Sequence, residues 1–267
     1  MTRVLALLYK DVADLRQNPS LFVPAVLTGL FSLLLPFVVA IIIPVFADER
    51  LSDSSDFEII VETYKNQPAM RGLDPEGTIQ AWIFQHFLVL LVLTPIAGSM
   101  SVAAYSVIGE KQARTLEPLL ATPITTFELL AAKVLGSLLP GLLLTIVCFS
   151  VYVAGVVIFA QPGVYRALFT PASLGIVFLL GPLASLAALQ LAVCVSSRVN
   201  DPRSAQQIGV LVILPIAGLL VVQLTGSFTL TGPVIVFVAL ALLGVNTGLM
   251  LLGIRLFDRE AILTRWK

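Results

Sequence analysis

The sequence predicts an all-α integral membrane protein with six transmembrane helices, and three observations lead to this class. Of the 267 residues, 58% are hydrophobic and only 12% are charged, and the mean hydropathy of +0.98 is far above that of soluble domains. The apolar residues form six runs of about 20 residues or more, the length at which a helix crosses roughly 30 Å of hydrocarbon. The charged residues lie between these runs. We place the spans near residues 20–46, 80–107, 134–160, 171–196, 206–225 and 232–255.

Residues 1–19 predict an amphipathic helix at the membrane surface. Leu8, Val12 and Leu15 recur at helical spacing, while the charged side chains lie mostly on other faces. The helix is expected to end near Pro19, because the residue before a proline is disfavoured in the helical region. Two roles remain open, a lipid-surface anchor and a contact with a cytosolic partner.

The distribution of Lys and Arg predicts that both termini, including a tail over 256–267, face the cytoplasm. With that orientation twelve of the 16 Lys and Arg residues lie on the inner side, as the positive-inside rule requires. The outer side holds Arg50, Lys65, Arg71 and Arg166. The largest outer segment, residues 47–79, is acidic and too small for a core of its own. It either caps the spans as a solvated loop, or gathers cations or docks a partner.

Several classes of function are not expected. The 16 Lys and Arg residues balance 16 Asp and Glu residues, so no basic surface predicts nucleic acid as a partner. The chain contains no P-loop, no H-E-x-x-H motif, no nucleophile elbow and no Cys/His metal cluster. The spans contain no Asp, Glu, Lys or Arg at membrane depth, which disfavours an ion-coupled carrier. Catalysis within this chain is therefore not expected, and neither is a cofactor or metal site.

A few polar residues and helix breakers remain inside the spans. Gln190, Gln223 and Asn246 are expected to hydrogen-bond between helices. His86 is expected to do the same, with metal binding or pH sensing as the alternative. The pairs Pro140-Gly141 and Gly181-Pro182 are expected to kink their helices, and they are candidate flexing points.

The charged segment between spans two and three, residues 109–133, predicts a helix, a hard turn and a second, capped helix. Glu110 opens a short helix of about two turns with an apolar side, and Pro123 ends it. Thr125 with Glu128 three residues later has the spacing of a capping box at the start of the next helix.

This segment resembles the cytoplasmic loop of ABC-2 type transporter permeases. The resemblance rests on an acidic residue that closes one span, a Thr-Leu-Glu, a Leu-Leu, a Thr-Pro, a second Glu and a Lys that opens the next span. Ala132 departs from the family, which often has glycine there. The matching positions are Glu110, Thr115, Leu116, Glu117, Leu119, Leu120, Thr122, Pro123, Glu128 and Lys133. Together with Arg114 and Thr125 they are the candidate coupling residues.

The resemblance implies a permease subunit of an exporter in a prokaryotic cell membrane. A separate ABC-type ATPase would bind ATP and Mg²⁺, and a second copy of the permease would complete the assembly. The matching residues would couple the two proteins: the leucines as a docking face, the Thr-Pro turn as a fixed corner, and the charged residues as polar contacts. Local capping and helix-end electrostatics are the alternative role of the carboxylates.

Two other functions stay open at this stage. A membrane scaffold or maturation factor would use the same ATPase to remodel a partner on the outer side. An intramembrane enzyme would need paired carboxylates or histidines at membrane depth, and only His86 is present. The apolar spans with a few amides weakly favour an amphiphile as substrate.

Overall fold

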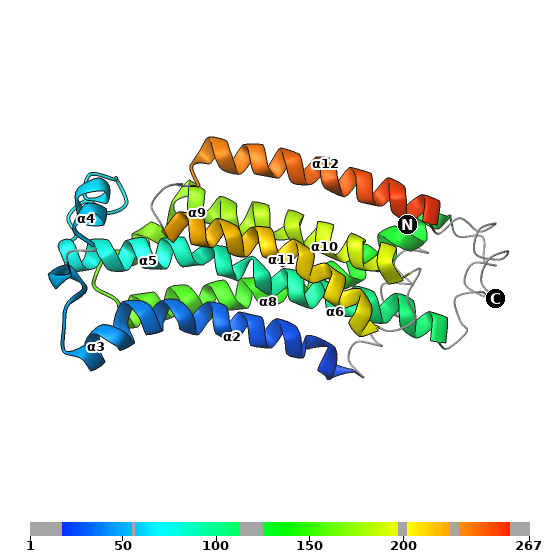
Figure 1. Cartoon of the computed structure of the whole chain (residues 1–267), viewed down its shortest axis with the longest axis horizontal. Coiled ribbons are helices and arrows are strands. Elements are labelled where there is room, and N and C mark those ends of the chain that lie inside the picture. The colour runs from blue at the N-terminus through cyan, green and yellow to red at the C-terminus, as the bar shows by residue number, and fades with distance from the viewer. Residues whose placement is uncertain (1–17, 55–56, 113–124, 197–201, 225–229, 257–267) are drawn as a thin grey trace.

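The computed structural model describes residues 18–54, 57–112, 125–196, 202–224 and 230–256. All regular structure within these ranges is helical, and the long helices run side by side in an elongated bundle (Figure 1). Five helical runs are long and apolar enough to cross a membrane, which confirms an all-α membrane fold. These runs are Pro19–Ala47, Pro75–Glu110, Phe127–Phe159, Pro171–Ser196 and Gly232–Leu256.

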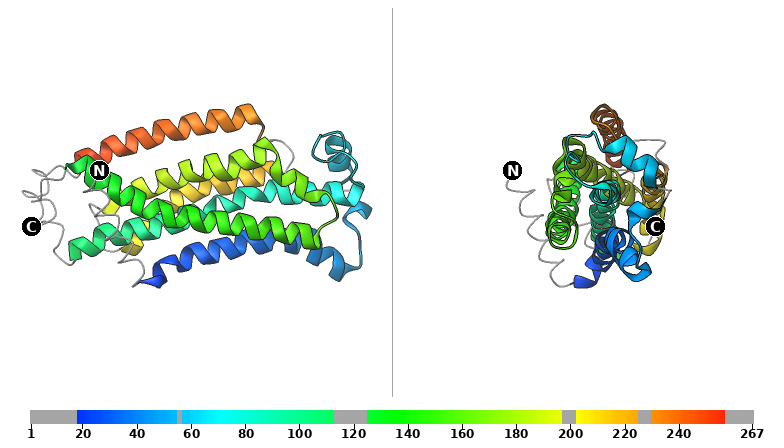
Figure 2. Two further views of the ribbon diagram at one scale, coloured as in Figure 1. Left: turned by 180° about the vertical axis from the view of Figure 1, so that it is seen from behind. Right: turned by 90° about the vertical axis from the view of Figure 1, so that its left-hand side faces the viewer.

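The run Pro75–Glu110 is the central axis of the bundle. It consists of α5 (Pro75–Leu91) and α6 (Leu93–Gln112). Of the 18-residue apolar stretch in this run, 89% is buried inside the bundle, whereas the value is 17% for the runs Pro19–Ala47 and Gly232–Leu256. The outer helices turn apolar side chains outward, as expected for helices that face lipid. These helices are α2 (Val23–Phe37), α8 (Thr126–Phe159), α11 (Pro202–Leu224) and α12 (Gly232–Leu256). By contrast, α10 (Gly181–Ser196) has no exposed residue and packs on α6, α11 and α12 (Figures 1 and 2).

The fifth predicted span, residues 206–225, corresponds to α11 and is not among these five runs. Its segment Leu214–Gln223 is apolar but shorter than a full span, and residues 225–229, 1–17 and 257–267 lie outside the described ranges. The predicted amphipathic helix and the tail therefore stay predictions.

One end of the bundle is formed by short elements, and we call it the α4 end. It contains α3 (Ile43–Ala47), the 3₁₀ turn η3 (Leu51–Asp53), α4 (Glu58–Tyr64) and the start of α5. The predicted loop 47–79 is therefore too long at its second boundary, because α5 already begins at Pro75. Asp74 sets this start: its carboxylate accepts a hydrogen bond of 2.9 Å from the Gly77 N–H, as an N-cap does.

Prolines explain the irregular turns within the runs. A proline ring clashes with the carbonyl four residues earlier, and a local π-helical turn relieves the clash. Four residues before Pro44 lies Ala40, inside the π-helical η2 (Val38–Ile42). Four residues before Pro182 lies Phe178, inside the π-helical η6 (Ile176–Leu180), which joins α9 (Pro171–Gly175) to α10. Figure 1 shows these runs continuing across both sites.

An aromatic cluster joins α2, α5 and α8 near the α4 end. The ring centroids of Phe37 and Phe84 are 4.9 Å apart, and those of Phe84 and Tyr152 are 5.9 Å apart. Tyr152 is fully buried, and its hydroxyl donates a 2.8 Å hydrogen bond to the Phe84 carbonyl oxygen. The cluster thus satisfies its one polar group internally, as burial requires.

Three helices meet closely on small residues in the middle of the bundle. A Cβ built at Gly98 of α6 would lie 3.1 Å from the Ala25 Cβ of α2 and 3.5 Å from the Gly141 Cα of α8. A Cβ at Gly141 would lie 3.0 Å from the Pro95 carbonyl oxygen. Small residues let helix backbones approach in this way inside membranes. Pro140-Gly141 was predicted to kink its helix. It does not interrupt the helix, because α8 is continuous from Thr126 to Phe159.

Candidate functional site

A buried ion pair joins α6 to α8 at the end of the bundle opposite α4. The Lys133 Nζ lies 3.0 Å from the Glu110 Oε2, and the two side chains are only 4% and 9% exposed. Lys133 also donates a 2.7 Å hydrogen bond to the Ser106 hydroxyl, one turn before Glu110 on α6. Charges buried to this degree persist in proteins only when they are paired. The pair therefore ties the last turn of α6 to the third turn of α8.

Both charges belong to the long helices. The sequence led to two expectations for Glu110, that it opens a separate short helix and that it closes a span. The first is wrong, because α6 continues through Gln112, and the second is confirmed, because Glu110 ends a run that is long enough to cross a membrane. Lys133 likewise lies inside α8, which begins at Thr126. The predicted spans 80–107 and 134–160 are therefore too short at this end, and Ser106 was not predicted to take part.

The capping box at the start of α8 is confirmed. The Glu128 backbone N–H donates a 3.2 Å hydrogen bond to the Thr125 Oγ1, and the Thr125 N–H donates a 2.9 Å bond to the Glu128 Oε2. Thr125 has extended backbone angles, as an N-cap residue should. Local side-chain chemistry thus sets where α8 begins.

Replacement of Thr125 by alanine should destabilise the first turn of α8 by about 1 kcal/mol, because one N-terminal N–H loses its acceptor. We expect faster hydrogen exchange at the amides of Glu128 and Leu129, measured by mass spectrometry. The matched control is Thr247→Ala, whose hydroxyl is exposed and bonds only to the Leu243 carbonyl of its own helix. Equal exchange in the wild type and Thr125→Ala would contradict the capping role.

Four of the twelve predicted coupling residues lie in the described ranges, and the structure brings them together at this one end. These are Glu110, Thr125, Glu128 and Lys133. The other eight fall within residues 113–124, outside the described residues, and their roles stay predictions. They are Arg114, Thr115, Leu116, Glu117, Leu119, Leu120, Thr122 and Pro123.

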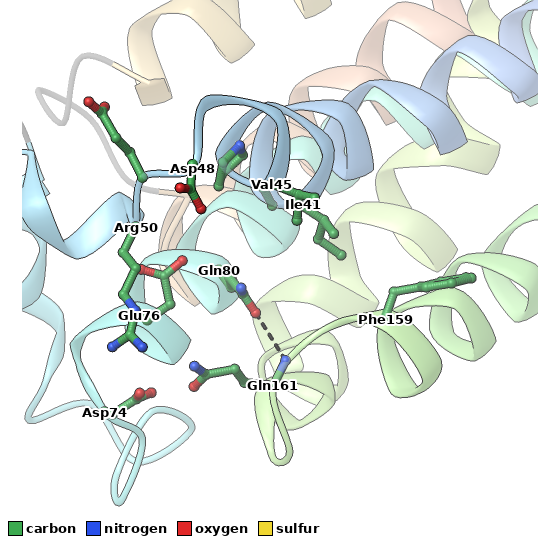
Figure 3. A pocket seen from close by; sticks show the side chains of 12 residues that line it. Ile41, Val45, Asp48, Arg50, Asp74, Glu76, Gln80, Phe159 and Gln161 are labelled. Atoms are coloured by element: carbon green, nitrogen blue, oxygen red, sulfur yellow. Dashed lines mark hydrogen bonds between the residues drawn. The ribbon is translucent and has the colours of Figure 1, made fainter.

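The α4 end contains an open pocket of about 680 Å³. Figure 3 shows Arg50, Asp74 and Glu76 on one side of it and Phe159 on the far side. The polar groups at this end hydrogen-bond the loops to α5. The Ser52 N–H donates to the Glu76 carboxylate at 3.0 Å, and the Gln161 N–H donates to the Gln80 side-chain oxygen at 3.0 Å. The acidic side chains that we assigned to a capping loop or a cation site thus include two with structural roles, Asp74 and Glu76.

No metal site is assembled here. Within the ranges that the structure describes, no group of three or more His, Cys, Asp or Glu side chains could hold a metal ion. His86 was expected to hydrogen-bond between helices, but its Nδ1 lies 2.8 Å from the carbonyl oxygen of Trp82 on the same helix α5. Its contact with another element is the Tyr64 ring of α4. Asn246 donates a 3.0 Å hydrogen bond from α12 to the Leu183 carbonyl of α10, which confirms its predicted role between helices.

The long apolar helices and their buried core define a multi-pass helical membrane protein. A family model described as ABC-2 family transporter protein matches residues 78–239, which is more than half of the chain. The chain therefore belongs to the ABC-2 transporter family, as the charged segment predicted, and is a permease component of an ABC transporter. No curated protein and no solved structure gives a significant match.

Proposed function

We propose that this chain is the permease subunit of an ABC exporter in a prokaryotic cell membrane, driven by ATP hydrolysis in a separate ATPase chain. In this proposal α11, a helix of 23 residues, is the fifth of six spans. Both termini face the cytoplasm, as the positive-inside rule predicts. The end with the ion pair is then cytoplasmic, and the α4 end lies outside.

The observation that carries the proposal, beside the family match, is the buried pair of Glu110 and Lys133. It joins the two helices that flank residues 113–124, at the end where the coupling residues are predicted. A force applied to that segment would act on α6 and α8 together, because separating them would expose or unpair two buried charges. The segment would thereby move a pair of spans as one body.

The proposed partners are an ABC-type ATPase, a second copy of this chain and membrane lipid. We propose the ATPase because ABC-2 permeases are driven by ABC-type ATPases. The second copy follows from the two ATP sites that such motors form as dimers, and lipid contact follows from the exposed apolar faces of α2, α8 and α12. ATP and Mg²⁺ would be bound by the ATPase.

The proposal is tested by a mild pull-down of the tagged chain from its native membranes. We expect a P-loop ATPase to co-purify with the wild type and to be lost with the double variant Glu117→Arg, Leu120→Asp, which reverses a charge and removes an apolar contact. The matched control carries the same changes at the α4 end, Glu58→Arg and Ile59→Asp, where both side chains are exposed. The control should retain the ATPase.

Absence of an ATPase from the wild-type sample would contradict the proposal. Loss from the control as well would place the effect in folding or insertion. Liposomes with the purified complex then separate export from remodelling, because ATP hydrolysis without movement of any candidate solute would favour the maturation factor.

A further inference from the structure

A small polar chamber lies inside the α4 end, between α4, α5, α9 and the ends of α11 and α12. Its volume is about 170 Å³, and its described lining contains glutamines, a histidine, a tyrosine and a threonine but no Asp, Glu, Lys or Arg. Thr231 directly precedes α12, and Ala172 is the second residue of α9. The chamber therefore lies at the level where membrane-crossing runs begin.

Two side chains give this chamber hydrogen-bond acceptors. Gln223 is only 3% exposed, and its Oε1 has no hydrogen-bond partner in the part of the chain that the structure describes. The His86 Nδ1 faces a carbonyl oxygen at 2.8 Å, and a carbonyl can only accept, so this nitrogen carries the proton. When the ring is neutral, its Nε2 is an acceptor. A buried acceptor without a partner is costly, and a ligand that donates a hydrogen bond to Gln223 would remove that cost.

The histidine ring is held in place before any ligand arrives. Trp82 lies at a centroid distance of 4.5 Å on one side, and Tyr64 of α4 meets the ring edge to face at 5.9 Å. A fixed ring gives the acceptor a defined direction at little entropic cost on binding. The chamber thus favours a polar group that donates hydrogen bonds and carries no net charge, since none of its described lining residues is charged and could pair with an ion.

An apolar groove begins where the chamber ends. Its volume is about 420 Å³, and every lining residue is apolar, from α5, η6, α10, α11 and α12. On α12 the lining residues run from Val238 to Leu249, which is about 16 Å along the helix. This length is roughly half of a 30 Å hydrocarbon layer, or one leaflet.

The chamber and the groove meet at two side chains. Ile176 and Leu230 line both cavities, so a polar compartment at the membrane boundary lies directly beside an apolar compartment one leaflet deep. The floor of the groove includes Ala184 and Ala187, whose small side chains leave the space open. Neither compartment alone specifies a ligand, but their order along the bundle does.

We propose that this chain binds a single-tailed amphiphile with an uncharged headgroup that donates hydrogen bonds. The headgroup occupies the chamber, where Gln223 and His86 accept its hydrogen bonds, and the tail lies in the groove between α10, α11 and α12. That this ligand is also the transported substrate rests on the proposed function, whereas its binding requires no ATPase.

The test measures binding of a brominated monoacylglycerol by quenching of Trp82 fluorescence. The chain has two tryptophans, and the background variant Trp266→Phe leaves Trp82 as the reporter beside the chamber. The protein is placed in phosphatidylcholine nanodiscs, because a detergent with a sugar headgroup has the same chemistry as the proposed ligand and would compete. We expect quenching by the brominated monoacylglycerol to saturate as its concentration rises. A lysophosphatidic acid with the same brominated tail should quench Trp82 at least tenfold more weakly than the monoacylglycerol.

Three variants locate the ligand. Gln223→Leu should weaken monoacylglycerol binding about tenfold, and Ala187→Phe should abolish it by filling the groove. Val147→Phe, the control on the exposed face of α8, should leave it unchanged. Gln223→Lys should reverse the preference toward the lysophosphatidic acid, and this gain of binding requires a folded protein.

Equal quenching in all variants and by both lipids would reflect partition into the bilayer alone and would overturn the proposal. Loss with Ala187→Phe but not with Gln223→Leu, together with no reversal by Gln223→Lys, would overturn the headgroup assignment. Binding as expected in a chain that recruits no ATPase would reject the proposed function and leave the binding site in place.

Discussion

Replacement of Lys133 by methionine is expected to lower the free energy of unfolding by about 3–5 kcal/mol, because it leaves the Glu110 carboxylate buried without its counter-charge. The methionine side chain keeps most of the apolar stem of the lysine, so the loss reflects charge rather than volume. Glu110 is 9% exposed in this pair, and water therefore compensates little. The measurement is denaturant or thermal unfolding of the purified chain in nanodiscs.

The double variant Glu110→Gln, Lys133→Met should recover most of this stability. It removes both charges, and a buried pair replaced by neutral side chains is often neutral or stabilising. The difference between the double variant and the sum of the single variants isolates the interaction. A double variant as unstable as Lys133→Met would show that Lys133 acts through packing or through Ser106 rather than through Glu110.

Replacement of Gly141 by valine is expected to destabilise the bundle by about 3 kcal/mol, because the contact between α6 and α8 has no room for a side chain. A Cβ at this position would lie 2.8 Å from the Ser99 hydroxyl oxygen and 3.0 Å from the Pro95 carbonyl oxygen. The second of these is a backbone atom, which cannot rotate away. Unfolding in nanodiscs and monodispersity on gel filtration measure the effect.

Gly244→Val on α12 is the matched control for this change. A Cβ at Gly244 meets nothing within 4 Å, and the two substitutions have the same intrinsic effect on a helix. The control should therefore stay within a few tenths of a kcal/mol of the wild type. Similar losses at both positions would mean that valine disfavours these helices generally, and that the close contact at Gly141 is not important.

Features that depend on neighbouring residues could be predicted from the sequence. The capping box needs only Thr125 and Glu128 at their spacing, and it is confirmed. The apolar runs need only composition, and five of the six are long and apolar enough to cross a membrane. The prolines within the helices could also be recognised from the sequence, but their effect on the backbone could not be predicted. Pro182 is accommodated by a π-helical turn, whereas α8 continues through Pro140 as an α-helix. The difference depends on packing around each proline, which no local pattern contains.

The pair of Glu110 and Lys133 could not be predicted, because it depends on how α6 and α8 are rotated against each other. Both residues were recognised as candidates, but they were placed in the charged segment 109–133, outside the predicted spans 80–107 and 134–160. The bundle buries them by extending each helix beyond its apolar run. The same limitation applies to Gln223, which was expected to bond between helices but whose Oε1 has no partner among the described residues.

The meeting of Ala25, Gly98 and Gly141 restricts where a solute could travel. At that point the backbones of α2, α6 and α8 approach so closely that a Cβ at Gly98 or Gly141 would lie within 3.1 Å of a neighbouring helix. A solute could pass between these three helices only if they moved apart. We therefore expect a passage to follow the opposite flank, along α10, α11 and α12, or the seam between two copies.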